Sequence, residues 1–214
     1  MEIKENNSLN AWKATLKLIM NKGEDFIDHD KRVCRELLNV LIIISSPEDI
    51  DEPIDVMKGF KEFVYPSKEE LKNTVLNKVS ASNYGYSYGF RLFNYRYTIN
   101  QIDNFILPLL KKDPKTRRGI AVLYDPLIDS SARKSGPGLV SIHFKIHKSK
   151  LNVTATIRSN DYFIGFPANI YQISIIQNYL AEKLKIDSGE IAVLSTSAHI
   201  FKEHFEMISD IISD

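Results

Sequence analysis

The stretch that decides the fold class is residues 139–158, LVSIHFKIHKSKLNVTATIR. In its first part, Leu139–His147, apolar and polar residues alternate with the period of two that is typical of a β-strand. The residues from Leu151–Arg158 alternate in the same way, and the polar residues between the two parts indicate a turn. The stretch is therefore predicted to be an antiparallel hairpin with one apolar and one polar face.

Helical patterns surround this hairpin. Apolar residues recur at helical spacing in four segments, 11–20, 68–78, 99–112 and 170–184, and again near the C-terminus. Shorter strands are expected at 118–124 and 191–194, whereas 35–44 is so uniformly apolar that it fits a helix or a buried strand. The pattern predicts a single α+β domain over 1–214, with helices covering a mainly antiparallel or mixed sheet.

Three segments lack a clear period. The sequence GEDFIDHD at 23–30 is expected to be a loop, and 47–66, with three prolines, is expected to be mostly loop with a short helix near 56–60. The third segment, 82–97, is rich in tyrosine and glycine. Composition alone favours a surface loop there, although glycine also lets the backbone approach a ligand.

Charge and cysteine content exclude several classes of protein. Lys and Arg total 28 against 27 Asp and Glu, so no bulk charge indicates nucleic acid or an anionic membrane as a partner. The single cysteine, Cys34, excludes a disulfide framework and any site with several thiolate ligands. The polar residues 1–10 and the short aliphatic run Val40–Ile44 give no signal peptide or membrane span, so a cytoplasmic protein is expected.

Several polar clusters could bind an anion or a heterocycle. The paired guanidiniums of Arg117 and Arg118 suit a phosphate, although two solvated arginines are the more ordinary interpretation. The sequence RSND at 158–161 adds a cation, a hydroxyl and a carboxylate. Asn169 could read a heterocycle with one donor and one acceptor, but capping of the following helix is the simpler role.

Histidine spacing gives no convincing metal site. His143 and His147 lie on one predicted strand face without matching acids, and His199 and His204 are no better as a pair. No metal is therefore expected.

The order of these clusters carries more information than any one of them. The sequence RSNDYFIGFPANIYQ at 158–172 closely resembles the thymidylate synthase signature RS-x-D-x-x-x-G-x-P-x-N-I-x-x. Other segments resemble that family in the same order: RELLNVL at 35–41, YGFRL at 88–92, NQID at 100–103, DPKTRRGIAVLYDP at 113–126 and SAHIF at 197–201. Length and the short N-terminal region are most similar to the compact archaeal-type synthases and the nucleotide hydroxymethylases. The resemblance implies a thymidylate synthase-like fold.

The resemblance also implies roles for matched residues. Glu36 corresponds to the catalytic glutamate, and Tyr88 lines the nucleotide site. The substrate class is a pyrimidine nucleoside monophosphate, and the other implied nucleotide contacts are Arg158 and Ser159 for the phosphate, Asn169 for the base, and His199 with Phe201 for the ribose. Relatives that act on cytosine tend to have aspartate at the Asn169 position, so a uracil base is favoured.

Two further implications concern a partner and a cofactor. In a homodimer, Arg117 and Arg118 would reach the phosphate bound by the other subunit. Asp161 and Gly165 would face a methylene-tetrahydrofolate or a related pterin. The chain lacks the long C-terminal tail that covers folate in the bacterial enzymes, which weakens the expectation of folate use.

One departure from the family bears directly on chemistry. The family's nucleophilic cysteine precedes the phosphate arginine by 20 residues, and here that position is Gly138. Glycine cannot add to C6 of a pyrimidine as a thiolate does. Cys34 lies two residues before Glu36, but nothing places its sulfur at position 138. Phe201 stands where the family has tyrosine, so a ribose-contacting hydroxyl is also missing.

Three functions remain open at this point. The first is a methyl- or hydroxymethyltransferase-like enzyme that acts at C5 of the pyrimidine, or a cysteine-independent variant of that chemistry in which Glu36 and a water do acid–base work. The second is a nucleotide-binding or regulatory homologue without catalysis. The third is an ordinary synthase in which the cysteine was deliberately replaced, leaving Gly138.

Overall fold

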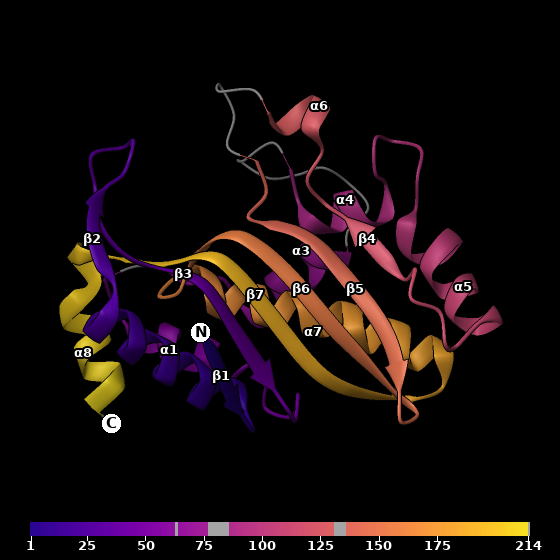
Figure 1. Ribbon diagram of the computed structural model, residues 1–214, viewed down its shortest axis with the longest axis horizontal. Helices are drawn as coiled ribbons and strands as arrows, with labels where there is room; N and C mark the ends of the chain where they lie inside the picture. The colour runs from indigo at the N-terminus through magenta and orange to yellow at the C-terminus, as the bar shows by residue number, and fades with distance from the viewer. Residues whose placement is uncertain (63, 77–85, 131–135, 214) are drawn as a thin grey trace.

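The computed structural model describes residues 1–62, 64–76, 86–130 and 136–213. A mixed sheet dominates the molecule (Figure 1). Its strands are β1 (Glu2–Glu5), β2 (Glu24–Ile27), β3 (Val33–Ile44), β4 (Ile120–Val122), β5 (Leu139–His147), β6 (Lys150–Asp161) and β7 (Asp187–Phe201). The helices are α1 (Ser8–Lys22), α2 (Glu52–Gly59), α3 (Lys68–Leu76), α4 (Tyr88–Phe93), α5 (Leu107–Lys112), α6 (Pro126–Asp129), α7 (Gly165–Leu184) and α8 (Phe205–Ser213). Two further turns are the π-helical η1 (Ile102–Ile106) and the 3-10 turn η2 (Lys202–His204).

The predicted hairpin is confirmed at the centre of this sheet. Strands β5 and β6 pair antiparallel, and Lys148 and Ser149 turn the chain with φ of 49° and 59°. The strand order is β1-β3-β7-β6-β5-β4, with β2 paired to β3. Because β6 pairs with β7 in parallel and β3 with β7 antiparallel, the sheet is mixed, and the predicted α+β class is confirmed.

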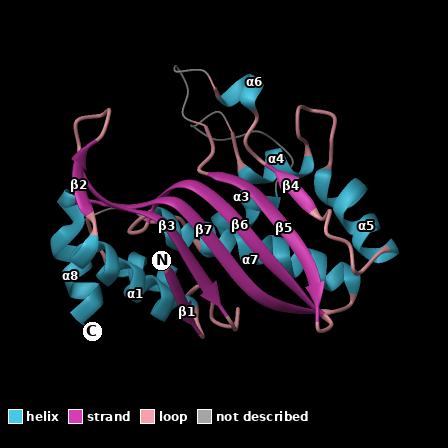
Figure 2. Ribbon diagram, viewed as in Figure 1, coloured by secondary structure: helices cyan, strands magenta, loops and turns pink. Residues whose placement is uncertain are grey.

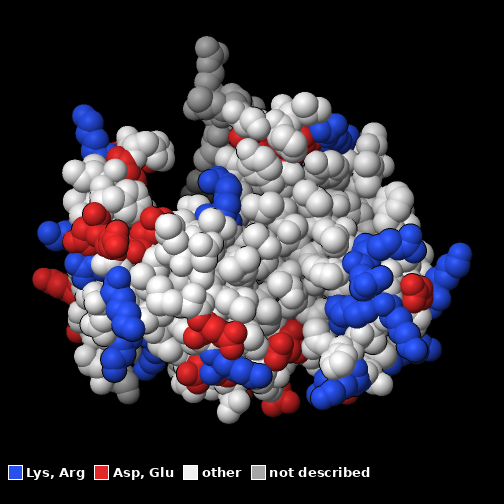
Figure 3. Space-filling view, in the orientation of Figure 1, with Lys and Arg blue, Asp and Glu red and all other residues white. Residues whose placement is uncertain are grey.

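Helices cover one face of the sheet. Helix α7 lies behind β6 and β7, and α1 packs on β3 (Figures 1 and 2). The core between these layers holds large side chains without solvent exposure, among them Trp12, Phe144 and Phe166. The opposite face, toward the viewer in Figure 3, is mostly uncharged at its centre, and charged side chains gather at its rim.

The structure settles the ambiguous segments and corrects two predictions. The apolar segment 35–44 lies in a strand, β3, and not in a helix. The expected loop at 23–30 contains β2, because its backbone pairs with β3 from Glu24 to Ile27. The part of the tyrosine-rich segment at 88–93 is no surface loop but the helix α4, where Phe90 and Leu92 are buried. Residues 82–85 of that segment, and residues 77 and 78 of the third predicted helix, lie outside the described residues.

Three neighbouring strands change the face that they bury at the same level of the sheet. On β6 the buried residues run through Ala155 and Ile157, and then burial shifts to Asn160. On β7 the same shift separates Ser195 from Ala198. On β3 the shift coincides with Asn39, whose φ is 56°. Breaks of this kind in strand alternation re-aim side chains and are frequent near active sites.

The strand β4 forms one edge of the sheet, and a side chain continues its hydrogen bonding. The Gln101 amide accepts from the Val122 backbone N–H at 3.0 Å and donates to the Val122 carbonyl at 2.7 Å. The same nitrogen donates to the Arg91 carbonyl at 2.9 Å. Gln101 therefore connects β4 to α4.

No helix in the described part of the chain is both long enough and apolar enough to cross a membrane.

Candidate nucleotide site

Gly138 lies against β6, the strand that carries the predicted phosphate residues Arg158 and Ser159. Its carbonyl accepts a hydrogen bond from the Arg158 backbone N–H at 2.9 Å. A Cβ built on Gly138 would lie 2.9 Å from the Ser159 carbonyl oxygen and 3.8 Å from the Tyr88 hydroxyl. Since 2.9 Å is closer than a carbon and a backbone oxygen normally approach, a side chain at position 138 requires a backbone shift. The space that a nucleophilic side chain would need at this position is therefore closed unless the backbone moves.

The Arg158 guanidinium holds the segment that precedes Gly138. Its Nε donates to the Pro137 carbonyl at 3.1 Å and its Nη2 to the Gly136 carbonyl at 2.8 Å. Arg158 and the adjacent Ser159 are both exposed, because they lie where β6 changes its buried face. The predicted phosphate pair is thus brought together next to Gly138.

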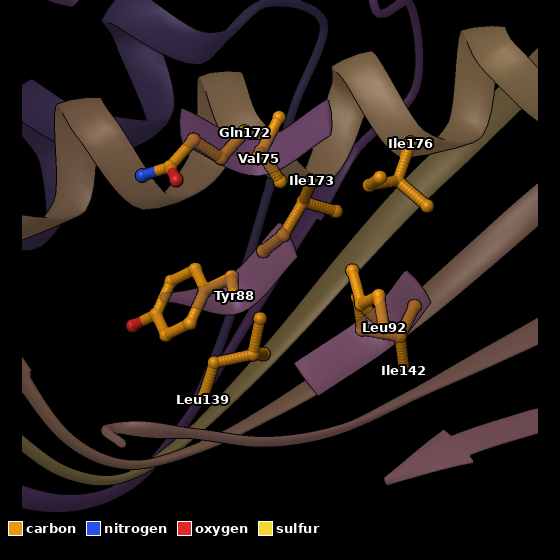
Figure 4. Close-up of a pocket in the computed structure, with 8 residues that line it drawn as sticks. All are labelled: Val75, Tyr88, Leu92, Leu139, Ile142, Gln172, Ile173 and Ile176. Carbon is orange, nitrogen blue, oxygen red and sulfur yellow. The ribbon is translucent and has the colours of Figure 1, made fainter. Parts of the chain in front are cut away.

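Tyr88 connects Gly138 to Asn169. Its hydroxyl donates to Asn169 Oδ1 at 3.2 Å, and Asn169 Nδ2 donates to Asn160 Oδ1 at 3.1 Å. Figure 4 shows the Tyr88 ring between α7 and β5, with its hydroxyl directed away from Ile176. The helix α7 begins four residues before Asn169, so the prediction that Asn169 caps this helix is wrong. Its amide lies between the Tyr88 hydroxyl and the Asn160 side chain instead.

A row of three titratable side chains crosses three neighbouring strands of the sheet. Glu36 on β3 lies opposite His199 on β7, which in turn lies opposite Asp161 on β6. Partners that are directly opposite one another project from the same face of a sheet. Within the described residues, no hydrogen bond engages the Glu36 carboxylate. His199 Nδ1 is 3.3 Å from the Ser197 hydroxyl.

Burial raises the pKa of Asp161 above its usual range. His199, hydrogen bonds from the Phe163 and Ile164 backbone N–H groups, and His204 oppose this increase. Both backbone bonds reach Oδ1, at 2.9 and 3.2 Å. Among the described residues, no hydrogen bond reaches Oδ2. Gly165 lies next to the Asp161 side chain, since a Cβ on Gly165 would be 3.5 Å from Asp161 Cβ.

Phe201 is covered by an arginine. The guanidinium carbon of Arg32 lies 3.3 Å from the centre of the Phe201 ring, and the ring of His199 meets it edge-on at 5.3 Å. Arg32 is held there by Glu203, at 2.6 Å. The position that carries the ribose-contacting hydroxyl in the resembling family is therefore apolar and shielded.

Arg117 and Arg118 lie elsewhere in the same chain. Both are exposed, and they precede β4, where the Gly119 carbonyl accepts from the Phe144 backbone N–H. Phe144 is six residues along the strand from Gly138, or roughly 20 Å at the rise of a β-strand. The two arginines do not join Arg158 within one chain.

A match to known proteins identifies the family of this site. The family model described as thymidylate synthase matches residues 13–214. The chain belongs to the thymidylate synthase family.

Curated relatives agree with this assignment. A protein of Methanosarcina mazei named "Putative thymidylate synthase" is 28% identical over 210 residues, which cover 98% of this chain and 94% of that protein. A protein of the same name from Methanosarcina barkeri is 30% identical over 202 residues, covering 94% and 90%. The thymidylate synthase of Bacillus phage phi3T is 28% identical over 127 residues, covering 57% and 45%.

The free cysteine does not replace the nucleophile of the family. Cys34 is 2% exposed, and its sulfur lies 3.9 Å from Asp28 Oδ2. Burial and the negative charge of Asp28 raise its pKa to about 11. Burial also raises the pKa of Tyr88, so its hydroxyl is neutral near pH 7 and does not act as a phenolate nucleophile.

Two ion pairs with buried carboxylates were not predicted from the sequence. Arg91 meets Asp129 at 2.6 Å, with both side chains almost fully buried, and the partly exposed Arg96 makes two hydrogen bonds to the buried Asp125 at 2.6 and 2.7 Å. The first pair ties α6 to α4, and the Arg96 guanidinium holds the pKa of Asp125 well below its usual range. The only hint in the sequence was two arginines within an otherwise aromatic segment, a pattern that does not identify their partners.

The described residues contain one group with metal-ligand geometry. Asp28, His29 and Asp30 bring ligand atoms within 4.8 Å of one another on the β2–β3 connection. The group is largely exposed, and such acidic clusters are common without a metal. His143 and His147 are not part of it.

The arrangement therefore combines a guanidinium and a hydroxyl, a fixed amide, and a carboxylate–imidazole–carboxylate row. It can bind a phosphate and a heterocycle and move protons. Among the described residues, it holds no activated nucleophile.

Proposed function

We propose that the chain binds a uracil nucleoside monophosphate and acts on its C5 position without a covalent thiol adduct. The observation that carries this proposal is the convergence of Arg158, Ser159, Tyr88 and Asn169 around a closed Gly138. Arg158 and Ser159 bind the phosphate, and Asn169 pairs with the base carbonyl and ring N–H. The single cysteine and the family are compatible with a cytoplasmic location.

Water is the proposed nucleophile. It adds across the C5=C6 bond, with its oxygen bound to C6; Glu36 accepts its proton and returns it to solvent, and a proton from solvent is delivered to C5. The reverse reaction releases water and leaves a hydrogen from the solvent at C5. The free Glu36 carboxylate beside His199 supports this role.

Under this proposal, the site discriminates only weakly between ribose and deoxyribose. His199 contacts the ribose, but Phe201 offers neither a donor nor an acceptor. A site selects against a missing or added hydroxyl only when a buried polar partner would be left unpaired. We expect UMP and dUMP to bind within a few-fold of each other.

The side chains near Asp161 are compatible with a bound pterin. Asp161 keeps Oδ2 without a hydrogen bond in the described structure, and a carboxylate pairs well with the N–H groups of a pterin. Asp161 and Gly165 are the residues that would hold such a cofactor. A methylene-tetrahydrofolate bound there would supply a one-carbon unit and its electrons.

A homodimer would complete the phosphate site. Arg117 and Arg118 lie far from Arg158 in one chain, and the sheet face without helices is uncharged at its centre (Figure 3). We expect subunits carrying Arg117→Ala and subunits carrying Arg158→Ala to form mixed dimers with one intact site each. Recovery of dUMP binding after mixing supports this arrangement, and a strictly monomeric protein contradicts it.

The test of the activity combines binding with exchange. Calorimetric titration with dUMP and UMP should show saturable binding, and deoxyuridine should bind much more weakly. In D2O, the proton NMR signal of H5 of bound dUMP should then decay, and Glu36→Gln should abolish the decay while binding remains. Failure of all uracil monophosphates to bind would overturn the proposal.

Binding without exchange would favour a second function, a regulatory or nucleotide-binding subunit. The closed Gly138 position favours this candidate as well, because it removes the family's nucleophile without disturbing the residues around the base. The same closure argues against an ordinary synthase with an exchanged cysteine, since such a site would have room for a Cβ.

A further inference from the structure

A buried chain of polar groups lies behind Asn169. Asn160 accepts from Asn169 and donates through Nδ2 to the Ser195 hydroxyl at 3.1 Å, and that hydroxyl lies 2.8 Å from the Tyr162 hydroxyl. Asn160, Ser195 and Tyr162, here named the amide relay, have no solvent exposure. None of the three has an assigned part in nucleotide binding.

The amide relay fixes which end of the Asn169 amide faces which direction. Asn169 Nδ2 meets the Asn160 oxygen, and Asn169 Oδ1 meets the Tyr88 hydroxyl. Each end keeps one further hydrogen-bonding position: an N–H at the nitrogen and a lone pair at the oxygen. Uracil offers a ring N–H and a carbonyl, which match this pair, whereas cytosine offers a ring nitrogen acceptor and an amino group, which match the reversed amide.

Reversal of the amide is opposed along the whole relay. Turning Asn169 alone would place two carbonyl oxygens against each other at Asn160. Turning Asn160 as well would place its oxygen against the Ser195 hydroxyl, which would then have to donate to Asn160 and accept from Tyr162. Tyr162 is itself held, because its ring stacks on Phe166 at 5.0 Å. A buried network in which every member is paired resists such a change more than a single hydrogen bond does.

We infer that Asn160 and Ser195 determine the base specificity of the site by holding Asn169 in the orientation that reads uracil. This inference rests on the proposed function, because it requires Asn169 to contact the base. Asn160 and Ser195 are positioning residues, since they act through Asn169 and do not touch the nucleotide.

The ratio of dUMP affinity to dCMP affinity tests the inference. Wild-type protein should prefer dUMP, Asn160→Ala should lower the ratio by roughly tenfold, and Ser195→Ala should lower it several-fold. Ser174→Ala is the matched control: Ser174 is a buried serine on α7 whose hydroxyl donates to the Tyr171 carbonyl outside the relay. Its ratio should equal that of the wild type.

The outcomes separate the two proposals. If wild type binds neither nucleotide, the proposed function is overturned and this inference with it. If wild type prefers dUMP but Asn160→Ala and Ser195→Ala weaken both nucleotides equally, only the inference is overturned. Should Asn160→Ala fail to fold, Ser195→Ala and Tyr162→Phe decide the question by the same ratio.

Discussion

Asn169, the residue proposed to bind the base, and Gly138, the position of the family's nucleophile, both lie next to Tyr88, yet their surroundings differ. The Tyr88 hydroxyl is 3.2 Å from Asn169 Oδ1 and 3.8 Å from where a Cβ of residue 138 would lie. The Asn169 amide is hydrogen-bonded to Tyr88 and Asn160 and still offers one donor and one acceptor. At Gly138, backbone packs directly on backbone. Under the proposed function, recognition of a nucleotide and covalent attack on it are therefore separable within one site.

The largest expected effect concerns the only thiol. With a pKa of about 11 instead of 9.0, Cys34 carries about 100-fold less thiolate at pH 8 than an ordinary cysteine. Iodoacetamide should modify it correspondingly slowly, and about tenfold faster for each unit of pH up to about 11. Free cysteine under the same conditions is the reference. Rapid modification at pH 8 would show that Cys34 is an activated thiol, and would contradict the absence of a nucleophile near Gly138 among the described residues.

Removal of the phosphate cation should come next in size. Charge-assisted hydrogen bonds contribute about 1.5–3 kcal/mol each, so Arg158→Ala should weaken dUMP binding by about 10- to 100-fold in a calorimetric titration. Arg158→Lys keeps the charge and is expected to retain part of the affinity. Equal affinity in wild type and Arg158→Ala would place the phosphate elsewhere.

A matched pair of glycine substitutions sharpens the contrast. Gly138→Ala should lower the free energy of unfolding by about 1–3 kcal/mol, because its Cβ meets the Ser159 carbonyl oxygen at 2.9 Å. Gly165→Ala should be neutral or stabilising by up to about 1 kcal/mol, because its nearest contact is 3.5 Å away and it begins a helix. Urea denaturation measures both. Equal losses would show that position 138 is no tighter than position 165.

The last prediction concerns the pH dependence of stability at Asp161. Burial raises its folded-state pKa above the unfolded value, so the native state binds the proton more tightly. The resulting stabilisation is complete below the unfolded pKa of 3.8 and is lost as the pH rises through the folded pKa. Asp161→Asn should therefore be more stable than wild type at pH 7, with a difference that shrinks as the pH falls toward 3.8. A variant that is less stable than wild type at pH 7 would contradict this sign.

Local patterns predicted the elements better than they predicted contacts. Strict alternation identified the β5–β6 hairpin, since a period of two belongs to an extended strand with one buried face and does not fit a helix. A uniformly apolar segment such as β3 carries no period, and its conformation was decided by pairing with distant β7. The buried role of Asn160 was equally hidden, because it depends on the change of face within β6.

The family resemblance named the candidate site residues, but not their geometry. In the structure Asn169 contacts Tyr88 and Asn160, and Arg158 contacts Pro137. The tight approach of Gly138 to the Ser159 carbonyl could not be foreseen, because it is a distance between two backbones. For the same reason, the shielding of Phe201 by Arg32 was not anticipated.

The side-chain amide of Gln101 has a consequence for how this protein meets other proteins. An exposed edge strand is a template on which foreign strands can add and aggregates can grow. At Val122, both outward-facing backbone groups are already taken by that one amide. A strand that added to β4 at Val122 would first have to displace the Gln101 amide from its two hydrogen bonds. Gln101 therefore blocks strand addition at this position.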